Sequence, residues 1–345
     1  MNEVDVAMRN IEQLEKVLAT PSAAGVEDMA KLDGDILILG VGGKMGPSLA
    51  KLAVNTAREA GVKRRVIGVS RFSSGGLAEE LQKCGVETLA ADVLDEAQLQ
   101  SLPEVENVIY MIGFKFGSHG QEHRTWAVNT YLPGRVAEKF SDSRIVAFST
   151  GNVYPLTPLT MGGASEEHPP APVGEYAQSC LGRERVFTYF SSLHKTPMVL
   201  FRLNYAIDMR YGVLLDVATA VKEQRPIDLS MGHANVIWQG DANELALRAL
   251  HVASSPPLVL NVTGPEMVSI RWLAQRFGDL LGVEPIFTGQ EQNTALLSNA
   301  SRAHQLFGYP RVSLRQMIEW MAQWVQLEGE TLGKPTHFQE RKGRF

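Results

Sequence analysis

Residues 36–46 read ILILGVGGKMG, an apolar run that passes directly into a glycine-rich turn. A continuous apolar run is typical of a strand that is buried on both faces of a parallel sheet. The residues after the turn include Leu49, Leu52 and Ala53, whose spacing predicts a helix with an apolar face. A glycine turn between a buried strand and a helix predicts a site for the diphosphate of a dinucleotide, and a plain turn is the alternative.

The three spaced glycines of this turn differ in their expected roles. Gly40 allows the tight turn, and Gly43 lets a pyrophosphate approach the backbone where the free N–H groups of the helix favour an anion. Gly46 lets the helix pack close to the sheet. The cofactor-binding residues predicted in this turn are Gly40, Gly43, Lys44, Met45 and Gly46.

Similar apolar runs recur along the chain and alternate with stretches that look helical. The runs cover residues 66–69, 86–90, 108–112, 145–148, 198–203 and 258–262. The helix-like stretches are 46–60, 77–84, 95–101, 119–140, 174–194 and 241–254. This alternation predicts right-handed crossovers and an α/β fold with a doubly wound parallel Rossmann sheet.

The segments outside this alternation divide the chain further. The predicted parts are a helical N-terminal extension (1–34), a dinucleotide-binding domain (35–203 plus 240–263), a smaller C-terminal substrate domain (204–239 plus 264–328) and a polar tail (329–345). We interpret the extension as a packing arm. Because the tail is polar and rich in glycine, we expect it to be poorly ordered.

The composition is that of an ordinary globular enzyme. The 345 residues are 44% hydrophobic and 21% charged, with a net charge of -5, so there is no general reason to bind nucleic acid. The two cysteines form neither a disulfide framework nor a zinc cluster, which suits the reducing cytoplasm. No apolar run reaches the roughly 18 residues of a membrane span. We expect a cytoplasmic protein with a small-molecule substrate.

The end of the second predicted strand bears on the choice of cofactor. A carboxylate is expected there if the ribose 2′-hydroxyl of NAD is bound, but the chain has Ser70 and Arg71. A hydroxyl and a guanidinium suit a 2′-phosphate better, and Lys44 could add a second positive charge. The sequence therefore favours NADP(H), with NAD(H) as the alternative and a solvated Arg71 as the simpler explanation.

With these residues in place, residues 35–328 resemble the extended short-chain dehydrogenase/reductase family, also called the NAD-dependent epimerase/dehydratase family. The glycines at 40, 43 and 46 match its GxxGxxG spacing. Further matching positions are Asp92 and Val93, Ile112 and Gly113, Asn129, residues 149–154 (STGNVY) and Tyr176. The resemblance implies that Asp92 and Val93 contact adenine. It also implies cofactor contacts for Ile112, Gly113, Asn129 and Tyr176.

The resemblance further implies hydride chemistry on a carbinol or ketone, often in a sugar nucleotide. Tyr176 would exchange a proton with the substrate oxygen, and Thr150 would hydrogen-bond the same oxygen. A free tyrosine has a pKa near ~10, so a basic role near neutral pH requires a nearby positive charge. The family supplies that charge with a lysine four residues later, but this chain has Cys180 there.

The missing lysine leaves the source of positive charge open. A unit charge at ~4 Å, in an effective dielectric of 20, contributes about 4 kcal/mol, or roughly three pKa units. We expect Lys115, just beyond the fourth strand, to be the third catalytic residue with Thr150 and Tyr176. A phosphate contact and a solvated position are equally open for Lys115, and Arg183 is a second candidate cation. Without such a charge, the protein would bind a dinucleotide and catalyse nothing.

The remaining expectations concern the substrate and the partners. The predicted substrate-binding residues are His119, Asn152, Arg202 and Asn204. No metal is expected, because no third ligand accompanies the spaced pair His119 and His123. The resemblance implies a homodimer, formed by the helices at 119–140 and 174–194. The expected activity is an NAD(P)-dependent oxidoreductase, epimerase or dehydratase reaction on a sugar, a sugar nucleotide or a related polyhydroxylated molecule.

Overall fold

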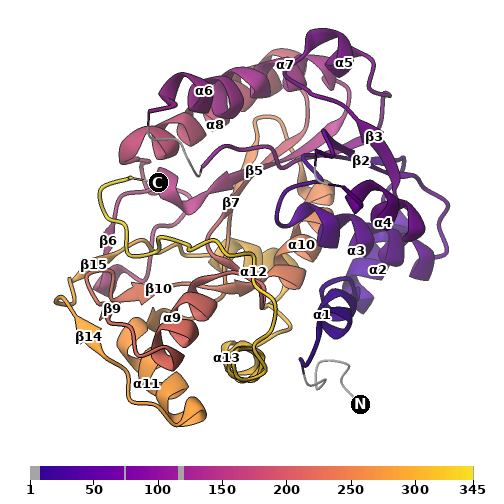
Figure 1. Ribbon diagram of the computed structural model, residues 1–345. Helices are drawn as coiled ribbons and strands as arrows, with labels where there is room; N and C mark the ends of the chain where they lie inside the picture. Colours follow the sequence, from indigo (N-terminus) through magenta and orange to yellow (C-terminus); the bar gives the residue numbers. More distant parts are fainter. Residues whose placement is uncertain (1–7, 74, 116–119, 345) are drawn as a thin grey trace.

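A seven-stranded parallel sheet with helices on both faces forms the larger lobe of the computed structural model (Figure 1), which describes residues 8–73, 75–115 and 120–344. The strands are β1 (Ile36–Leu39), β2 (Val66–Ser70), β3 (Glu87–Ala90), β4 (Asn107–Tyr110), β5 (Arg144–Thr150), β7 (Met198–Leu203) and β12 (Leu258–Val262). They are the seven predicted strands, with small shifts at their ends. The predicted α/β fold class is confirmed.

The order of the strands places the site. Across the sheet it is β12-β7-β5-β4-β1-β2-β3, so the chain changes direction between β1 and β4. Leu39 at the end of β1 pairs with Val69 on one side and Tyr110 on the other. In an open parallel sheet, ligands bind beyond the carboxyl ends of the strands at such a switch point.

Two apolar layers fix the helices to the sheet. One face is covered by α2 (Ala23–Lys31), α3 (Gly46–Glu59), α4 (Leu77–Lys83) and α10 (Gln239–Arg248) with the short η4 (Ala249–Val252). The other is covered by α5 (Glu96–Gln100), α6 (Glu122–Trp126), the π-helical turn η1 (Ala127–Tyr131), α7 (Leu132–Lys139) and α8 (Gly174–His194). Every β1 side chain is fully buried between these layers, as its apolar run predicts.

A second, smaller lobe lies below the carboxyl ends of the strands. Its elements are β8 (Ala206–Ile207), α9 (Val213–Lys222), β9 (Ile227–Asp228), β10 (His233–Ala234), β11 (Ile237–Trp238), β13 (Val268–Ser269), α11 (Ile270–Leu281), β14 (Phe287–Thr288), β15 (Thr294–Ala295) and α13 (Leu314–Gln326). Short elements linking the lobes are η2 (Gly151–Val153), β6 (Thr157–Pro158), η3 (Leu159–Met161) and α12 (Ser301–Phe307). Trp238, Phe277 and Trp320 are buried at the centre of its core.

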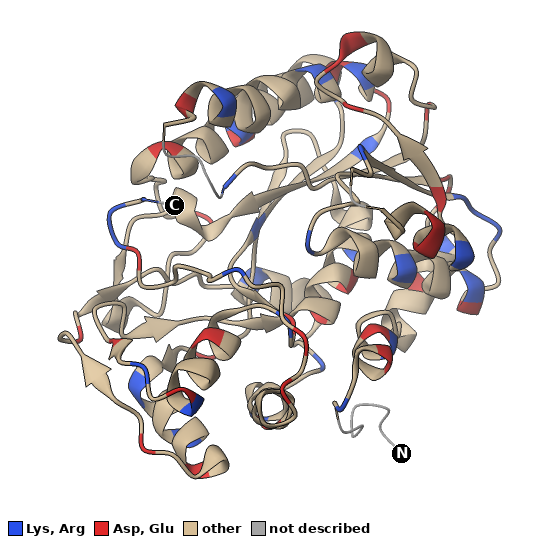
Figure 2. Ribbon diagram, viewed as in Figure 1, with Lys and Arg blue, Asp and Glu red and all other residues tan. Residues whose placement is uncertain are grey.

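The N-terminal residues connect the two lobes. Helix α1 (Ile11–Leu18) buries Leu14 and Leu18 in the core of the smaller lobe. On its other side Glu15 forms ion pairs of 2.8 Å with Lys51 of α3 and with Arg210 of the smaller lobe. Figure 2 shows both signs of charge close together where α1, α3 and α4 meet.

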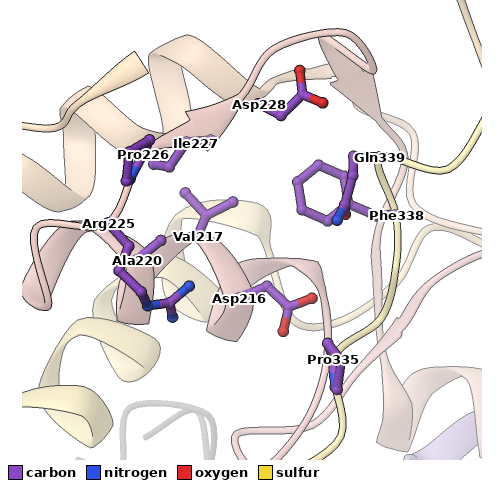
Figure 3. Close-up of a pocket in the computed structure, with 10 residues that line it drawn as sticks. All are labelled: Asp216, Val217, Ala220, Arg225, Pro226, Ile227, Asp228, Pro335, Phe338 and Gln339. Atoms are coloured by element: carbon purple, nitrogen blue, oxygen red, sulfur yellow. The ribbon is translucent and has the colours of Figure 1, made fainter. Parts of the chain in front are cut away.

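The expectation of a poorly ordered tail is wrong for residues 329–344. They form no helix or strand, but they lie along the smaller lobe, and Phe338 is only 6% exposed in its core. Figure 3 shows Phe338 across a pocket from Val217 and Ala220 of α9. One buried aromatic ring in a polar segment is a weak sequence signal, which is why composition alone misses this contact. In the described part of the chain, no helix is long and apolar enough to cross a membrane.

Candidate active site

The glycine turn has the geometry that its sequence predicts. Gly40 has φ +90°, and a Cβ there would lie 2.9 Å from the side chain of Ile112. A Cβ at Gly46 would collide with the carbonyl of Val41, so glycine also lets α3 approach the loop closely. No side chain caps the N-terminus of α3, which leaves backbone N–H groups available to an anion.

A groove of about 300 Å³ runs from this turn along the carboxyl ends of the strands. The predicted cofactor-binding residues that line it are Gly40, Gly43, Ser70, Arg71, Asp92, Val93, Ile112 and Gly113. Arg124, which was not predicted from the sequence, also lines the groove, with its guanidinium 5.2 Å from the centre of the Phe114 ring. The uncapped helix, the glycine turn and this groove fit a dinucleotide.

Asn129 supports the groove from behind and does not line it. Its side chain is fully buried in η1 and accepts a hydrogen bond from Phe114 N at 2.8 Å. Its Nδ2 donates to Phe114 O and to Ser179 Oγ, both at 3.0 Å, and its Oδ1 also accepts from Arg183 at 2.9 Å. These four bonds use the capacity of the amide. The structure therefore replaces the predicted cofactor contact with a role in fixing the turn at Phe114.

Lys44 lies on the opposite side of the turn from Arg71. Its Nζ donates to the carbonyl of Ala206 at 3.4 Å and lies 3.8 Å from the centre of the Tyr211 ring. Part of the residue is exposed, but burial of the ammonium, with the like charge of Lys115, lowers the pKa of Lys44 to about 7. The expectation that Lys44 adds charge beside Arg71 is therefore wrong. Its side chain extends across the turn to the smaller lobe.

Thr150 and Tyr176 meet at the end of β5. Thr150 Oγ1 accepts hydrogen bonds from the backbone N of Asn152 at 3.2 Å and from its Nδ2 at 3.0 Å. The side chain of Tyr176 hydrogen-bonds those of Thr150 and Cys180. Since Asn152 supplies two donors to Thr150, the hydroxyl proton of Thr150 is directed toward Tyr176. Asn152 therefore orients the hydroxyl of Thr150.

The surroundings of Tyr176 keep its phenol neutral. Burial is the largest effect, and with the neighbouring Cys180 it raises the pKa of Tyr176 above its usual value, while the charge of Arg183 opposes the rise. Lys115 faces the aromatic ring, with its Nζ 5.6 Å from the ring centre. Burial lowers the pKa of Lys115 to about 8, so its ammonium is still mainly charged at neutral pH.

Arg183 is the second cation near this hydroxyl. It is 5% exposed and donates to the carbonyl of Phe148 at 2.7 Å and to the side chain of Asn129 at 2.9 Å. Its charge acts on both Tyr176 and Cys180. The structure thus places near Tyr176 both of the cations that the sequence offered as substitutes for the missing lysine.

Arg202 has a structural place, contrary to the prediction that it binds substrate. It is 4% exposed and donates to both carboxylate oxygens of Glu184, at 2.9 and 2.6 Å. Its remaining nitrogen donates to the hydroxyl of Tyr154 at 2.6 Å. Each of the three guanidinium nitrogens therefore has a partner within the protein.

Asn204 is buried beside Gly151, the residue that follows Thr150. Its Nδ2 has no hydrogen-bond partner among the described residues, and neither has the hydroxyl of the neighbouring Ser298. Buried polar atoms are normally satisfied, so these two atoms are available to a bound molecule. Asn204 was predicted from the sequence, whereas Ser298 was not, because the segment around it carries no motif. His119, the remaining predicted residue, lies outside the described residues.

Comparison with known proteins agrees with this geometry. Residues 36–207 match the model of the NAD dependent epimerase/dehydratase family. A search of curated proteins gave no match.

One solved structure of similar fold is a UDP-glucuronic acid 4-epimerase variant from Bacillus cereus, in complex with a UDP-sugar and NAD. Its TM-score is 0.69 at 18% identity, and the match covers 85% of this chain and 99% of that chain. An epimerase from Methanothermobacter thermautotrophicus has a TM-score of 0.69 at 19% identity, covering 90% and 100%. UDP-glucose 4-epimerase from Thermotoga maritima, with UDP-glucose, has a TM-score of 0.66 at 17% identity, covering 85% and 98%. At these identities the similarity is one of fold.

Proposed function

Residues 36–207 belong to the NAD dependent epimerase/dehydratase family, and on that premise we propose that the protein is an NAD(P)-dependent oxidoreductase or epimerase/dehydratase. Its substrate would be a sugar, a sugar nucleotide or a related polyhydroxylated molecule, and Tyr176 would be the acid/base. The observation that carries this proposal is the hydrogen-bonded pair of Thr150 and Tyr176, at the edge of the sheet where a dinucleotide groove also ends.

The chain's own residues would handle the proton. Tyr176 holds a proton on its hydroxyl at neutral pH, because burial raises its pKa. In the reducing direction it would donate that proton to the substrate oxygen, and in the oxidising direction it would accept one. Thr150, held by Asn152, would hydrogen-bond the same oxygen and align it with the phenol.

The groove would hold the cofactor, whose nicotinamide supplies hydride transfer when bound. Gly43 and the start of α3 would bind the diphosphate, and Asp92 and Val93 would border the adenine. NADP(H) is our preferred cofactor, because Ser70 and Arg71 line the groove where a carboxylate would select NAD.

A cation must favour the charged form of the phenol in the oxidising direction. Lys115 is our first candidate, since it lies over the Tyr176 ring and is mainly protonated at neutral pH. Arg183 would act on Tyr176 through its charge, because its guanidinium nitrogens donate to backbone carbonyls and to Asn129. Together they would replace the motif lysine that Cys180 displaces.

The substrate would lie between the lobes. Asn204 is our first candidate for a direct contact, because its buried amide has a donor without a partner among the described residues. Asn152 and His119 remain proposals for the same role. The solved structures of similar fold that carry UDP-sugars favour a nucleotide sugar.

A dinucleotide-binding protein without catalysis is the second candidate. It is favoured by one observation: Cys180 occupies the lysine position, and it helps to raise the pKa of Tyr176 instead of lowering it. The retained pair of Thr150 and Tyr176 favours the enzyme.

The two candidates can be separated by a substrate screen. The protein with NADP⁺ or NAD⁺ would be offered sugars and sugar nucleotides while cofactor absorbance is followed and products are separated by chromatography. An enzyme is expected to give a reduced cofactor, or an epimerised or dehydrated product without net reduction. Tight cofactor binding with neither outcome across the screen would instead support the binding protein.

We also propose a homodimer formed through η1, α7 and α8. These helices lie together on one side of the sheet (Figure 1), and their outer surface exposes large apolar side chains. Tyr131 is 63% exposed, Tyr189 62% and Leu193 56%. Exposed apolar side chains gathered on neighbouring helices are typical of an interface.

A further inference from the structure

The C-terminal strap, which we define as residues 329–344, is fastened along the smaller lobe. Phe338 is buried in the core of that lobe. Arg341 donates to the carbonyls of Ser230 and Thr294, each at 2.9 Å, and to the Thr294 hydroxyl at 2.6 Å. Several independent contacts therefore hold the strap in one course.

The strap also reaches the larger lobe. Its start is still on the smaller lobe, where Leu332 N donates to the carbonyl of Arg210 at 3.0 Å. At its far end Gly343 packs so closely against Gly174 that a Cβ at Gly174 would collide with the Gly343 backbone. Gly174 begins α8, the helix that carries Tyr176. The strap thus crosses from the smaller lobe to the catalytic helix (Figure 1).

A cleft of about 650 Å³ lies beneath the start of the strap. Gly42, Gly43 and Gly113 line both this cleft and the dinucleotide groove, so the two cavities meet at the glycine turn. The strap contributes Leu332 and Lys334 to the cleft wall. A ligand bound at the glycine turn would therefore have the strap on its outer side.

The carboxylates of this cleft are already paired. Glu15 forms ion pairs with Lys51 and Arg210, both at 2.8 Å. Glu80 forms an ion pair with the same Lys51 at 2.5 Å. Arg210 is in turn paired with the buried Asp208 at 2.7 Å. These contacts leave no lining carboxylate to neutralise a further cation.

Two lysines of the cleft lack such a partner. Among the described residues, neither Lys44 nor Lys334 forms a salt bridge. Lys44 contacts the Ala206 carbonyl and the Tyr211 ring, and the charge of Asp208 acts on it, but Asp208 is already paired with Arg210. Lysines without an ion-pair partner next to a glycine turn favour an anionic ligand.

We propose that the strap closes the outer side of the dinucleotide site and that Lys334, with Lys44, binds the diphosphate of the dinucleotide. This inference rests on the proposed function, because it requires that a dinucleotide binds. A diphosphate could also come from a nucleotide-sugar substrate. The diphosphate of the cofactor is favoured, because the cleft is continuous with the glycine turn. The dinucleotide then leaves only after the strap lifts.

Binding of NADPH, followed by its fluorescence, tests the role of Lys334. Lys334→Ala is expected to weaken NADPH binding about 5- to 10-fold, the usual effect of losing one charge-assisted hydrogen bond at a partly exposed site. The matched control is Lys342→Ala, an exposed lysine of the same strap outside the cleft, which is expected to leave the affinity unchanged. Adenosine 2′-monophosphate, which lacks the diphosphate, is expected to bind both variants and the unaltered protein equally.

The release of NADPH tests the closing role of the strap. Arg341→Ala removes three strap contacts far from the cleft and is expected to speed NADPH dissociation roughly 5-fold in a chase with excess NADP⁺. Circular dichroism checks that the variant is folded. If it is not, Thr336→Val, which removes one hydroxyl bond to Asp216, serves the same purpose.

Three results would overturn the inference while leaving the proposed function intact. The first is unchanged NADPH affinity in Lys334→Ala, and the second is unchanged NADPH release in both folded strap variants. The third is a loss of UDP-glucose affinity in Lys334→Ala without any loss for NADPH, which would assign the diphosphate to the substrate. If the unaltered protein binds neither NADPH nor NADH, the proposed function fails as well.

Discussion

Tyr176 differs from a free tyrosine because its hydroxyl is desolvated and shares hydrogen bonds with Thr150 and Cys180. Burial disfavours the phenolate, so the pKa of Tyr176 is raised. The phenol therefore carries its proton at neutral pH and can donate it. A lysine in place of Cys180 would lower that pKa strongly, whereas a neutral thiol does not. Two cations remain near this side chain: Lys115, which lies beyond β4 and faces the ring, and Arg183, which lies farther along α8.

The pH dependence of turnover should identify which cation acts. The pKa of Lys115 is lowered to about 8, so its charge is present below that pH and lost above it. We expect oxidative turnover to fall as pH rises through about 8. In Lys115→Arg this fall should move to a higher pH, beyond the measured profile, because arginine stays protonated. Lys115→Ala should cost at least about tenfold in turnover at neutral pH.

The matched control for this profile is Lys63→Arg, an exposed lysine distant from the site. An alkaline limb that is the same in Lys115→Arg as in the unaltered protein would exclude Lys115 as its origin. Arg183 would then be the remaining candidate, because its charge does not titrate in this range.

Arg71 should determine the preference between the two cofactors. Arg71→Ala is expected to weaken NADPH binding about 10- to 100-fold, as for the loss of a charged hydrogen-bond pair, and NADH binding by less than about twofold. Isothermal titration measures both, and the exposed Arg58→Ala is the control. Equal losses for NADPH and NADH, or no loss for either, would contradict a 2′-phosphate contact.

Helix α8 carries both the proposed acid/base, Tyr176, and a set of buried charged side chains that pack against the sheet. Its first turns carry Tyr176 and Cys180, and the next turn carries Arg183 and Glu184, which are buried against β5 and β7. Glu184 joins the strands by accepting from Ser149 at 2.6 Å and from Arg202. The same helix thus carries Tyr176 near its start and, farther along, a buried polar network that fixes it to β5 and β7.

Removal of Arg202 should cost stability more than substrate binding. Arg202→Ala leaves Glu184 buried without its partner, and we expect a loss of about 3–5 kcal/mol in the free energy of unfolding. Arg202→Met combined with Glu184→Leu should recover most of that loss, since it removes both charges. Urea unfolding measures both variants. A stable Arg202→Ala protein with a specifically raised KM would instead restore Arg202 as a substrate contact.

The sequence predicted best those features that depend on residues close together in the chain. The strand and glycine pattern of residues 36–46 predicted the turn, the groove and the sheet, because each depends on neighbouring residues. Arg202 and Asn129 have the residue types expected of ligand contacts. Their partners, such as Glu184 and Phe114, come from other elements, so sequence position alone could not show that their polar groups were already used.

At the scale of the whole molecule, segments near both ends of the described chain connect the two lobes. Helix α1 inserts apolar side chains into the smaller lobe and pairs Glu15 with α3, while the strap returns from the smaller lobe to α8. Neither contact is visible in composition, since the extension resembles any short amphipathic helix and the strap resembles a disordered tail. Both border the cleft beside the glycine turn.

The proposed homodimer can be tested at this scale. Tyr189→Glu places a charge on the exposed apolar surface of α8 and is expected to convert a dimer into a monomer, because burying an unpaired carboxylate is costly. Size-exclusion chromatography with light scattering gives the mass. Tyr309→Glu, at a 72% exposed tyrosine on a different surface, should leave the mass unchanged. A monomer before any substitution would contradict the proposal.

We propose that Tyr176, held by Thr150, exchanges a proton with the substrate beside a dinucleotide. Turnover of Tyr176→Phe on the substrate found in the screen tests this directly, with cofactor affinity measured on the same sample and Tyr309→Phe as the control. We expect a loss of at least about 100-fold in kcat with nearly unchanged cofactor affinity, because a positioned acid/base is removed. Full turnover of Tyr176→Phe, with the cofactor still bound, would contradict it.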